Sequence, residues 1–439
     1  MTFETPKNVN YSAVVCQLKE FVDLPNCDFV KHALIFGNAI IVSKDAEAGQ
    51  IGLFFPVECA LSKEFLGANN LFRKPELGNV DPEQKGFFEE HGRVKAVKFR
   101  GHKSEGFWIP LTSLGYLVPE GTLFPVGTVF DAIGDHEICR KYVPKGRAPG
   151  ISKNQKRQAR LEDSIVADQF RLHFDTENLR RNAHKICPTD WISISDKWHG
   201  TSVVISKVLV KRTLPWYENL LSKLGVAVQT HEYGLVYSSR KVIKAVNEVS
   251  KGSAQHFYTT DIWGDVAREV EDKIPAGFTL YGEIVGFTSD GAAIQKGYHY
   301  GCGPNQHRFL VYHVTSTNAE GKVLPLSRPQ MYEFCSKMGL EAVPLLWYGQ
   351  AQEMYKIPFD QHWNEELVKR LEDNYVVDQS CPHNYNEVPA EGIVVWIDKY
   401  EDPEAFKLKN FRFLEAESKL LDTGEMDTET QQSEEECVS

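Results

Sequence analysis

One segment of the sequence combines residues that could carry out chemistry, and it runs Asp196-Lys197-Trp198-His199-Gly200-Thr201-Ser202. It follows Trp191–Ser195, where apolar and polar residues alternate as they do in a half-buried strand. A lysine at the end of a strand, just before a glycine-containing turn, can direct its amine into a pocket. Because a single Lys-x-x-Gly recurs by chance in many chains, this segment alone would indicate only an exposed loop lysine.

Five more segments follow downstream, and each predicts a strand with polar residues at its edge. They are Tyr237-Ser238-Ser239-Arg240, Thr279–Gly286, Arg308–Tyr312, Glu391–Val395 and Phe406-Lys407-Leu408-Lys409. In order and residue type, the six segments resemble motifs I, Ia, III, IIIa, IV and V of the covalent nucleotidyltransferases. This superfamily includes DNA ligases, RNA ligases and mRNA-capping enzymes.

Within that superfamily the chain resembles the ATP-dependent, nick-sealing RNA ligases of phage type. The resemblance is carried by Lys197-x-His199-Gly200-Thr201 and by three further segments, Tyr281–Gly286, Ile294-Gln295-Lys296 and His173–Leu179. A capping guanylyltransferase or a DNA ligase would favour aspartate at position 199 and a C-terminal OB domain. An RNA-binding protein with a decayed ligase domain is the alternative outside enzymes.

The resemblance implies that Lys197 attacks ATP and carries AMP to a 5′-phosphate, which a 3′-hydroxyl then attacks. The expected substrate is RNA or an RNA-containing nicked duplex, the expected function is RNA repair, and the expected metal is Mg²⁺ or Mn²⁺ at Glu391. We expect Glu283 to bind a ribose hydroxyl, Tyr312 to stack on adenine, and Lys407 and Lys409 to stabilise the α-phosphate. The full set of expected nucleotide-binding residues is Asp196, Gly200, Ser202, Arg240, Glu283, Tyr312, Glu391, Lys407 and Lys409.

Three features depart from the phage-type pattern. Ser202 stands where those enzymes usually carry asparagine. Only 30 residues follow Lys409, so we expect no helical C-terminal domain. Residues 206–232 look like an insertion; within it, Leu214–Leu224 has helical periodicity and Gly225 would end the helix.

The predicted fold is α+β, with an N-terminal OB-like β-barrel in residues 1–139. Its short strands include Tyr11–Leu18 and Ala33–Val42, and Gly92–Phe99 places basic residues on one face. This basic face could contact nucleic acid or could be an ordinary solvated surface. A ligase domain of ATP-grasp-like antiparallel sheets and helices is expected over residues 164–414.

Charge is unevenly distributed along the sequence. Residues 140–160 contain eight Lys or Arg and no acid, and we expect a basic linker over residues 140–163. Residues 415–439 carry nine acids and one lysine, which predicts an acidic, disordered tail. Without that tail the net charge of −11 becomes −3.

The remaining features indicate a monomeric intracellular protein, cytoplasmic or nuclear, with no membrane partner. No apolar run is long enough to span a bilayer, and Met1–Asn10 lacks the apolar core of a signal peptide. The nine cysteines show no CxxC spacing, so neither a disulfide framework nor a structural zinc site is expected. Cys381 and His383 could bind a metal, although a surface loop is the simpler interpretation.

Overall fold

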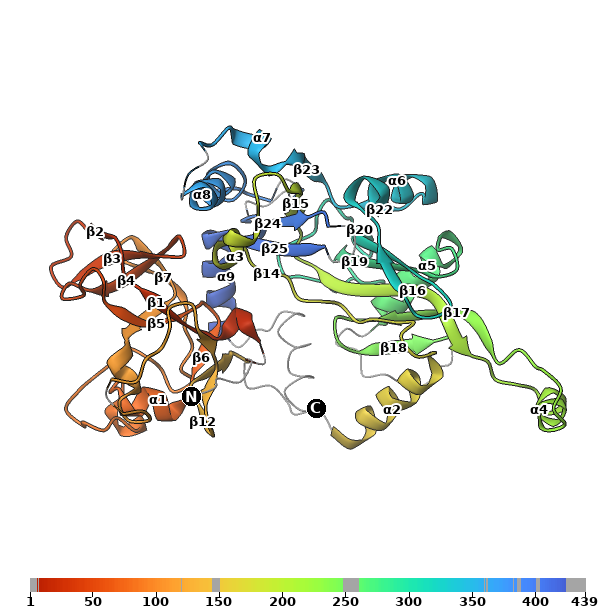
Figure 1. The fold of residues 1–439 in the computed structure, drawn as a ribbon, viewed down its shortest axis with the longest axis horizontal. Coiled ribbons are helices and arrows are strands. Elements are labelled where there is room, and N and C mark those ends of the chain that lie inside the picture. The colour runs from red at the N-terminus through yellow and green to blue at the C-terminus, as the bar shows by residue number, and fades with distance from the viewer. Residues whose placement is uncertain are drawn as a thin grey trace.

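A computed structural model describes most of the chain. It covers residues 6, 8–119, 121–143, 151–247, 260–358, 360, 362–381, 383–384, 388–399 and 403–423, with residues 151–156 as backbone only. Figure 1 shows an N-terminal module beside a larger C-terminal region, with an arm projecting from the far end of that region.

The N-terminal module is built from short strands, as the sequence predicted. The strands are β1 Ala13–Gln17, β2 Phe21–Asp23, β3 Val30–Ile35, β4 Asn38–Ser43, β5 Ile51–Phe55, β6 Cys59–Leu61, β7 Ala96–Phe99, β8 His102–Glu105, β9 Phe107–Pro110, β10 Val129–Phe130, β11 Ala132–Ile133, β12 His136–Glu137 and β13 Cys139–Lys141, and helix α1 is Lys63–Ala68. The predicted run Ala33–Val42 is a hairpin, because Phe36 and Gly37 take positive φ values of 51° and 74°.

Strand pairing in the module is local. The four-stranded sheet has the order β10-β1-β5-β9, and smaller groups join β2-β3-β4, β13-β6, β7-β8 and β11-β12. Within residues 8–143, apart from residue 120, these pairings close no barrel. The observed class is therefore mixed α+β.

The C-terminal region contains two larger sheets. Its strands are β14 Glu177–Asn178, β15 Trp191–Lys197, β16 Thr201–Lys211, β17 His231–Ser238, β18 Ile243–Val246, β19 Phe278–Gly286, β20 His307–Thr317, β21 Val323–Pro325, β22 Glu341–Ala342, β23 Leu345–Gln350, β24 Gly392–Ile397 and β25 Glu404–Lys409. The first sheet has the order β18-β17-β16-β19-β20-β21, with β22 also pairing with β20. The second has the order β14-β25-β24-β15-β23.

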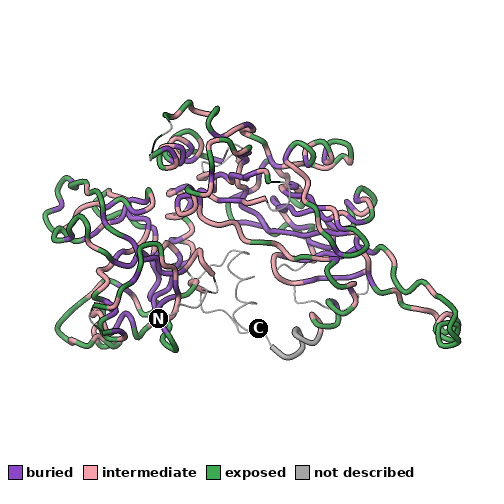
Figure 2. The backbone as a smooth tube through the Cα atoms, in the orientation of Figure 1, coloured by how far each residue is buried: buried purple, intermediate pink, exposed green. Residues whose placement is uncertain are grey.

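Helices pack against both sheets. The helices of this region are α2 Ile151–Ser164, α3 Leu179–Asn182, α4 Trp216–Lys223, α5 Ile262–Val270, α6 Arg328–Met338, α7 Ala351–Tyr355, α8 Trp363–Tyr375 and α9 Phe411–Asp422. On the first sheet α5 and α6 lie on one face and α2 on the other. Trp263 of α5 and Met331 of α6 belong to the core of the first sheet, whereas Trp363 of α8 packs with the second sheet. Figure 2 shows buried backbone concentrated in these layers. None of the helices in the described residues is both long and apolar enough to cross a membrane.

Helix α9 corrects two expectations from the sequence. The acidic tail was predicted to be disordered from residue 415, but residues 415–422 are helical and pack against β7; residues 424–439 lie outside the described residues. The basic face of Gly92–Phe99 is not an open nucleic-acid surface, because α9 covers it. The Arg93 side chain is 0% exposed and pairs with Glu58 and Asp422.

Neighbouring lysines follow the same pattern. Lys95 Nζ lies 2.8 Å from Asp422 Oδ1, and Lys98 Nζ lies 3.6 Å from Glu415 Oε2. Of the predicted strand Gly92–Phe99, only Ala96–Phe99 forms β7, and its burial does not alternate. The local pattern also carried no information about the helix that pairs with these basic residues.

The predicted linker is also largely ordered. Arg140 and Lys141 belong to β13, and residues 151–164 form α2. In α2, Arg157 Nη2 donates to the Lys244 carbonyl at 3.0 Å and Gln158 Nε2 donates to the Ile243 carbonyl at 2.8 Å. Residues 144–150 of the basic run lie outside the described residues.

Candidate active site

Lys197 is the last residue of β15, and strand pairing places it opposite the start of β24. Its register partner is Gly392, so the preceding residue, Glu391, is brought beside the amine. Lys197 Nζ lies 2.8 Å from Glu391 Oε1, and Lys409 Nζ lies 3.2 Å from the same oxygen. The Glu391 side chain is 1% exposed, whereas that of Lys197 is 15% exposed. The buried Glu391 carboxylate is therefore shared by two cations, which come from β15 and β25, the strands on either side of β24.

Gly200 and Ser202 bind a second buried carboxylate, Glu283, across strands β16 and β19. The Gly200 backbone N–H donates to Glu283 Oε1 at 3.1 Å, and Ser202 Oγ donates to Oε2 at 3.2 Å. A Cβ atom at position 200 would lie 2.2 Å from the Ile284 carbonyl oxygen, so only glycine fits. Each carboxylate oxygen can accept more than one hydrogen bond, so Glu283 keeps acceptor capacity for a ligand.

A cavity lies between the two sheets at this point. It occupies about 660 Å³, including open solvent at its mouth. Seven of the ten residues predicted for the site line it. Of the other three, Gly200 contacts the lining residue Glu283, Glu391 contacts the lining residue Lys197, and Lys409 contacts Glu391. The lining residues are His173, Phe174, Thr176, Ser195, Asp196, Lys197, Trp198, Ser202, Arg240, Glu283, Tyr312, Val343, Val394, Trp396 and Lys407.

Two acidic side chains around the cavity differ in electrostatics. Burial opposes ionisation of Asp175, but the Arg240 guanidinium pairs with it and lowers its pKa to about 2. Arg240 Nε donates to Asp175 Oδ1 at 3.0 Å, and Nη2 contacts the same oxygen. Burial raises the pKa of Asp196 to about 6. Asp175 is thus held ionised, while Asp196 is close to half-protonated in weak acid.

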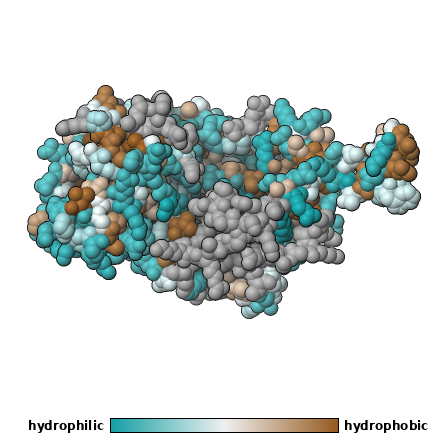
Figure 3. Space-filling view, turned by 90° about the horizontal axis from the view of Figure 1, so that it is seen from below, coloured by the Kyte–Doolittle hydropathy of each residue, from teal (hydrophilic) through white to brown (hydrophobic). Residues whose placement is uncertain are grey.

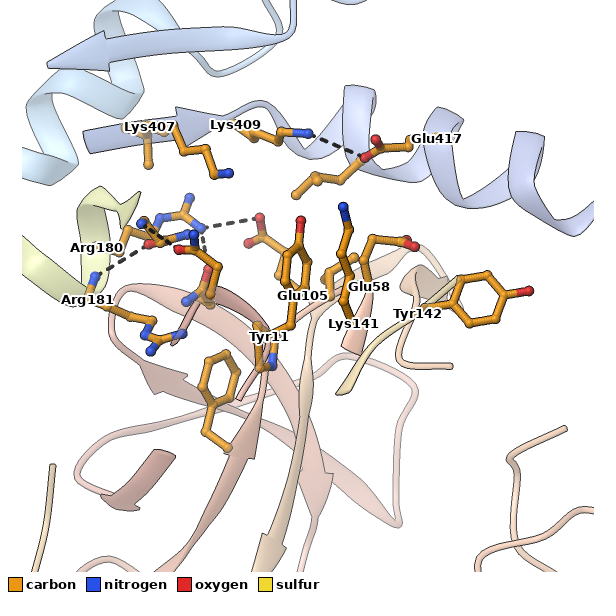
Figure 4. A pocket seen from close by; sticks show the side chains of 18 of the residues that line it. Tyr11, Glu58, Glu105, Lys141, Tyr142, Arg180, Arg181, Lys407, Lys409 and Glu417 are labelled. Atoms are coloured by element: carbon orange, nitrogen blue, oxygen red, sulfur yellow. Dashed lines mark hydrogen bonds and ion pairs between the residues drawn. The ribbon is translucent and has the colours of Figure 1, made fainter. Parts of the chain in front are cut away.

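Lys407 and Lys409 point from the same face of β25, as two residues at i and i+2 must. Lys407 lines both the cavity at Lys197 and a second cavity between the N-terminal module and β25, which Lys409 also lines. Figure 4 shows this second cavity, with Lys407 and Lys409 on one side and Lys141, Arg181 and Glu58 on the other. The two cavities therefore adjoin at Lys407.

Residues 191–409 match the family model described as RNA ligase. The chain belongs to the RNA ligase family. No curated protein matches the chain.

Solved structures of one RNA ligase share the fold along nearly the whole chain. A mutant of the Naegleria gruberi RNA ligase with ATP and Mn has a TM-score of 0.56 and 13% identity, covering 93% of this chain and 99% of that chain. The Naegleria gruberi RNA ligase with PPi has a TM-score of 0.54 and 14% identity, covering 93% and 98%. Another mutant, with AMP and Mn, has a TM-score of 0.54 and 13% identity, covering 92% and 98%.

Several side chains in the ligase cavity were not among the predicted site residues. Phe174, His313 and Trp396 form an aromatic cluster, with His313 and Trp396 stacked at 5.0 Å between ring centroids. Phe174 and Asp175 belong to the His173–Leu179 segment that resembles RNA ligases, and that resemblance was the available signal for them. Trp396 alternates with Val395 on β24, so it could have been assigned to the cavity face of that strand.

Cys381 and His383, which the sequence offered as a possible metal-binding pair, pack against apolar and aromatic side chains. Cys381 is buried in an apolar cluster, and the His383 ring packs against Trp198 at 4.9 Å. Across the described part of the chain, no group of three or more His, Cys, Asp or Glu side chains is arranged to hold a metal ion.

Proposed function

We propose that this ligase joins RNA 3′-hydroxyl and 5′-phosphate ends with ATP, through an AMP covalently bound to Lys197. The proposal depends above all on one observation: the Lys197 amine lies at the edge of a nucleotide-sized cavity, in contact with a carboxylate shared with Lys409. Naegleria gruberi RNA ligase, which shares the fold, was solved with ATP and Mn.

In the first step the Lys197 amine attacks the α-phosphorus of ATP. A new N–P bond forms, the bond from the α-phosphorus to the bridging oxygen breaks, and pyrophosphate leaves. The amine must be neutral to attack, although a lysine has a reference pKa of about 10.4. The ion pair with Glu391 favours the protonated amine, so the pair must be broken before the attack.

The cavity supplies contacts for each part of the nucleotide. The remaining acceptor capacity of Glu283 suits a ribose hydroxyl, and Tyr312 or the neighbouring Phe174 and Trp396 offer aromatic surface for adenine. Lys407 and Lys409 are placed to stabilise negative charge on the α-phosphate. Arg240 is fixed by Asp175, so its guanidinium reaches the nucleotide in a defined orientation.

Glu391 is the residue that we expect to bind Mg²⁺ or Mn²⁺, together with phosphate oxygens of ATP. The fit rests on its chemistry: a buried carboxylate between two cations offers the hard oxygen ligand that these ions prefer. When bound, such an ion supplies positive charge that stabilises the phosphates during transfer.

The later steps use the same side chains. A 5′-phosphate oxygen attacks the AMP phosphorus and frees the Lys197 amine, which gives an adenylylated RNA end. A 3′-hydroxyl then attacks the 5′-phosphorus, AMP leaves, and the hydroxyl proton is lost. Both transfers require in-line geometry and cationic stabilisation, which Lys407 and Lys409 can provide.

We propose that residues 1–139 form an OB-like substrate-binding module and that residues 164–414 form the adenylyltransferase domain. Since α9 covers the basic face around Arg93, phosphate contacts must come from elsewhere. The second cavity combines Lys141 and Arg181 with Lys407, and it adjoins the cavity at Lys197. We therefore place the 5′-phosphate side of a nicked, RNA-containing duplex along this boundary.

The test is nucleotide labelling followed by sealing. The protein is mixed with α-labelled ATP or GTP, with Mg²⁺ or with excess chelator, and then with nicked duplexes that carry RNA or DNA at the 3′-hydroxyl end. We expect covalent label from ATP alone, dependence on metal, and sealing of the RNA-ended nick. Labelling by GTP alone would support a capping activity, and absence of any label would contradict the proposal.

A further inference from the structure

An arm of residues 207–232 projects from the first sheet and ends in helix α4. Strands β16 and β17 pair as far as Lys211 and His231, and the connection between them contains α4. Figure 1 shows α4 at the end of this arm, distant from the rest of the molecule. The insertion identified in the sequence therefore forms a separate structural feature with no part in the proposed ATP site.

Helix α4 exposes its apolar side. Trp216 is 78% exposed and Leu224 is 71% exposed. With 100° between successive helical residues, the apolar side chains fall within an arc of about 140°. The exposed apolar set is Trp216, Tyr217, Leu220, Leu221 and Leu224 on the helix and Val226 just beyond it. Figure 3 shows apolar surface gathered at the end of the arm.

The polar side of α4 is turned toward the arm. Glu218 accepts hydrogen bonds from Arg212 Nη1 and Nη2 at 2.8 and 3.1 Å, and its side chain is 17% exposed. Asn219 Nδ2 donates to the Leu214 carbonyl at 3.2 Å. These contacts fix the rotation of the helix about its axis, so the apolar side faces outward. This arrangement is the inverse of an ordinary surface helix, which buries its apolar side.

The arm is basic, although the protein is acidic. Residues 207–232 contain Lys207, Lys211, Arg212 and Lys223 and two acids, Glu218 and Glu232, which gives the arm a net charge of +2, whereas the whole chain has a net charge of −11. An exposed apolar patch with a basic rim indicates a docking surface for an anionic partner that also accepts apolar side chains.

These features distinguish among the possible occupants. A second copy docked through the same arm would bring two basic rims together in a two-fold interface, which is unfavourable. RNA would accept Trp216 and Tyr217 by stacking, but Leu220, Leu221 and Leu224 have no π-face to stack. A groove in a protein selects a narrow stripe of anchors, whereas this apolar face is broad and extends to Val226. A lipid surface accepts a broad apolar face with tryptophan, tyrosine and flanking lysines.

We propose that α4 docks peripherally on an anionic lipid surface. Its leucines enter the acyl boundary, Trp216 and Tyr217 lie at the headgroup level, and Lys223 of the helix faces anionic headgroups. This proposal does not rest on the ligase reaction. It revises the expectation that the protein has no membrane partner, which was drawn from the absence of a spanning segment.

Vesicle co-sedimentation tests this proposal with the full-length protein. Vesicles of phosphatidylcholine alone are compared with vesicles that also contain phosphatidylserine. We expect binding to the mixed vesicles that weakens at high salt, and at least a tenfold loss of partitioning in the Trp216→Ala/Leu224→Ala double variant. The matched control is Phe29→Ala/Leu123→Ala, which removes two other highly exposed apolar side chains, from the N-terminal module, and should bind as the unaltered protein does.

Thermal unfolding of both variants checks that the fold is kept without relying on enzymatic activity. The proposal is overturned if the protein does not bind the mixed vesicles, or if the α4 variant binds them as well as the control does. Sedimentation velocity and RNA-binding measurements test the two other possible occupants of the apolar face. If the unaltered protein and the control are dimeric and the α4 variant is not, the occupant is a second copy; if only the α4 variant loses RNA affinity, the occupant is nucleic acid. Either result without vesicle binding contradicts the proposal.

Discussion

The cavity at Lys197 and the contact between the N-terminal module and α9 both pair cationic side chains with carboxylates, but the ion pairs differ in how many partners each charged group has. At the contact, the Arg93 guanidinium donates to Glu58, Asp422 and the Ser418 carbonyl, so each of its three nitrogens donates within the protein. In the cavity, Glu391 is shared by two lysines, and the Lys197 amine keeps some exposure. Saturated pairs fix the two parts of the molecule together, whereas shared pairs can be rearranged by a ligand.

The largest expected effect comes from breaking the shared pair. Glu391→Gln removes the carboxylate that we expect to bind Mg²⁺ or Mn²⁺ beside Lys197 and Lys409, and we expect the loss of that metal to lower the rate of Lys197 adenylylation by at least about a hundredfold. Glu417→Gln is the matched control, since Glu417 lies 3.6 Å from the same Lys409 but belongs to α9 rather than to the strand end beside Lys197. Single-turnover labelling with ATP measures both variants. Similar rates for the two would show that the position of Glu391 has no special role.

Breaking the saturated pair should affect stability. Arg93→Ala leaves Glu58 and Asp422 without their buried partner, and we expect a loss of about 3–5 kcal/mol in the free energy of unfolding. Lys98→Ala, which removes a half-exposed lysine 3.6 Å from Glu415, should cost no more than about 1 kcal/mol. Urea denaturation compares them. Equal, small losses would mean that α9 does not hold the module in place through Arg93.

The cavity also contains a carboxyl group whose burial carries a cost in stability. Burial raises the pKa of Asp196 from the ordinary aspartate value of 3.8 to about 6, so the folded state binds more protons than the unfolded state between these two pH values. Stability from this group is therefore lost as pH rises from about 4 to 6, and the loss persists above 6. We expect Asp196→Asn to be about 1–3 kcal/mol more stable than the unaltered protein at pH 7, and little different at pH 4. Unfolding free energies of both proteins between pH 4 and pH 7 measure the difference. A difference that does not change with pH would contradict the raised pKa of Asp196.

The two regions also differ in how far the sequence could predict them. Lys197, Glu283, Glu391 and Lys409 each lie on a strand or at its end, and residue order along antiparallel strands was enough to expect them together. The Arg93 contact joins residues more than 300 positions apart, Arg93 and Asp422, and no local pattern indicates such a partner. The helical start of the tail was missed for a related reason. Its composition indicated disorder, whereas in the structure Leu421 is buried and Ser418 Oγ donates to Glu58 of the module at 3.2 Å.

Other misses have equally local causes. The hairpin within Ala33–Val42 depends on the backbone at Phe36, a residue type that seldom takes a positive φ. The aromatic cluster of Phe174 and Trp396 joins a segment before β15 to β24, so the contact between the two rings could not be predicted without the sheet order.

The most direct test of the account locates the AMP. After incubation with ATP and Mg²⁺, the protein is digested and the modified peptide is sequenced by mass spectrometry, alongside Lys197→Ala and the control Lys207→Ala, a lysine of β16 that does not line the cavity. The account predicts one AMP on Lys197, none on the Lys197→Ala protein, and unchanged modification in the control. AMP on another residue, or undiminished modification of Lys197→Ala, would contradict it.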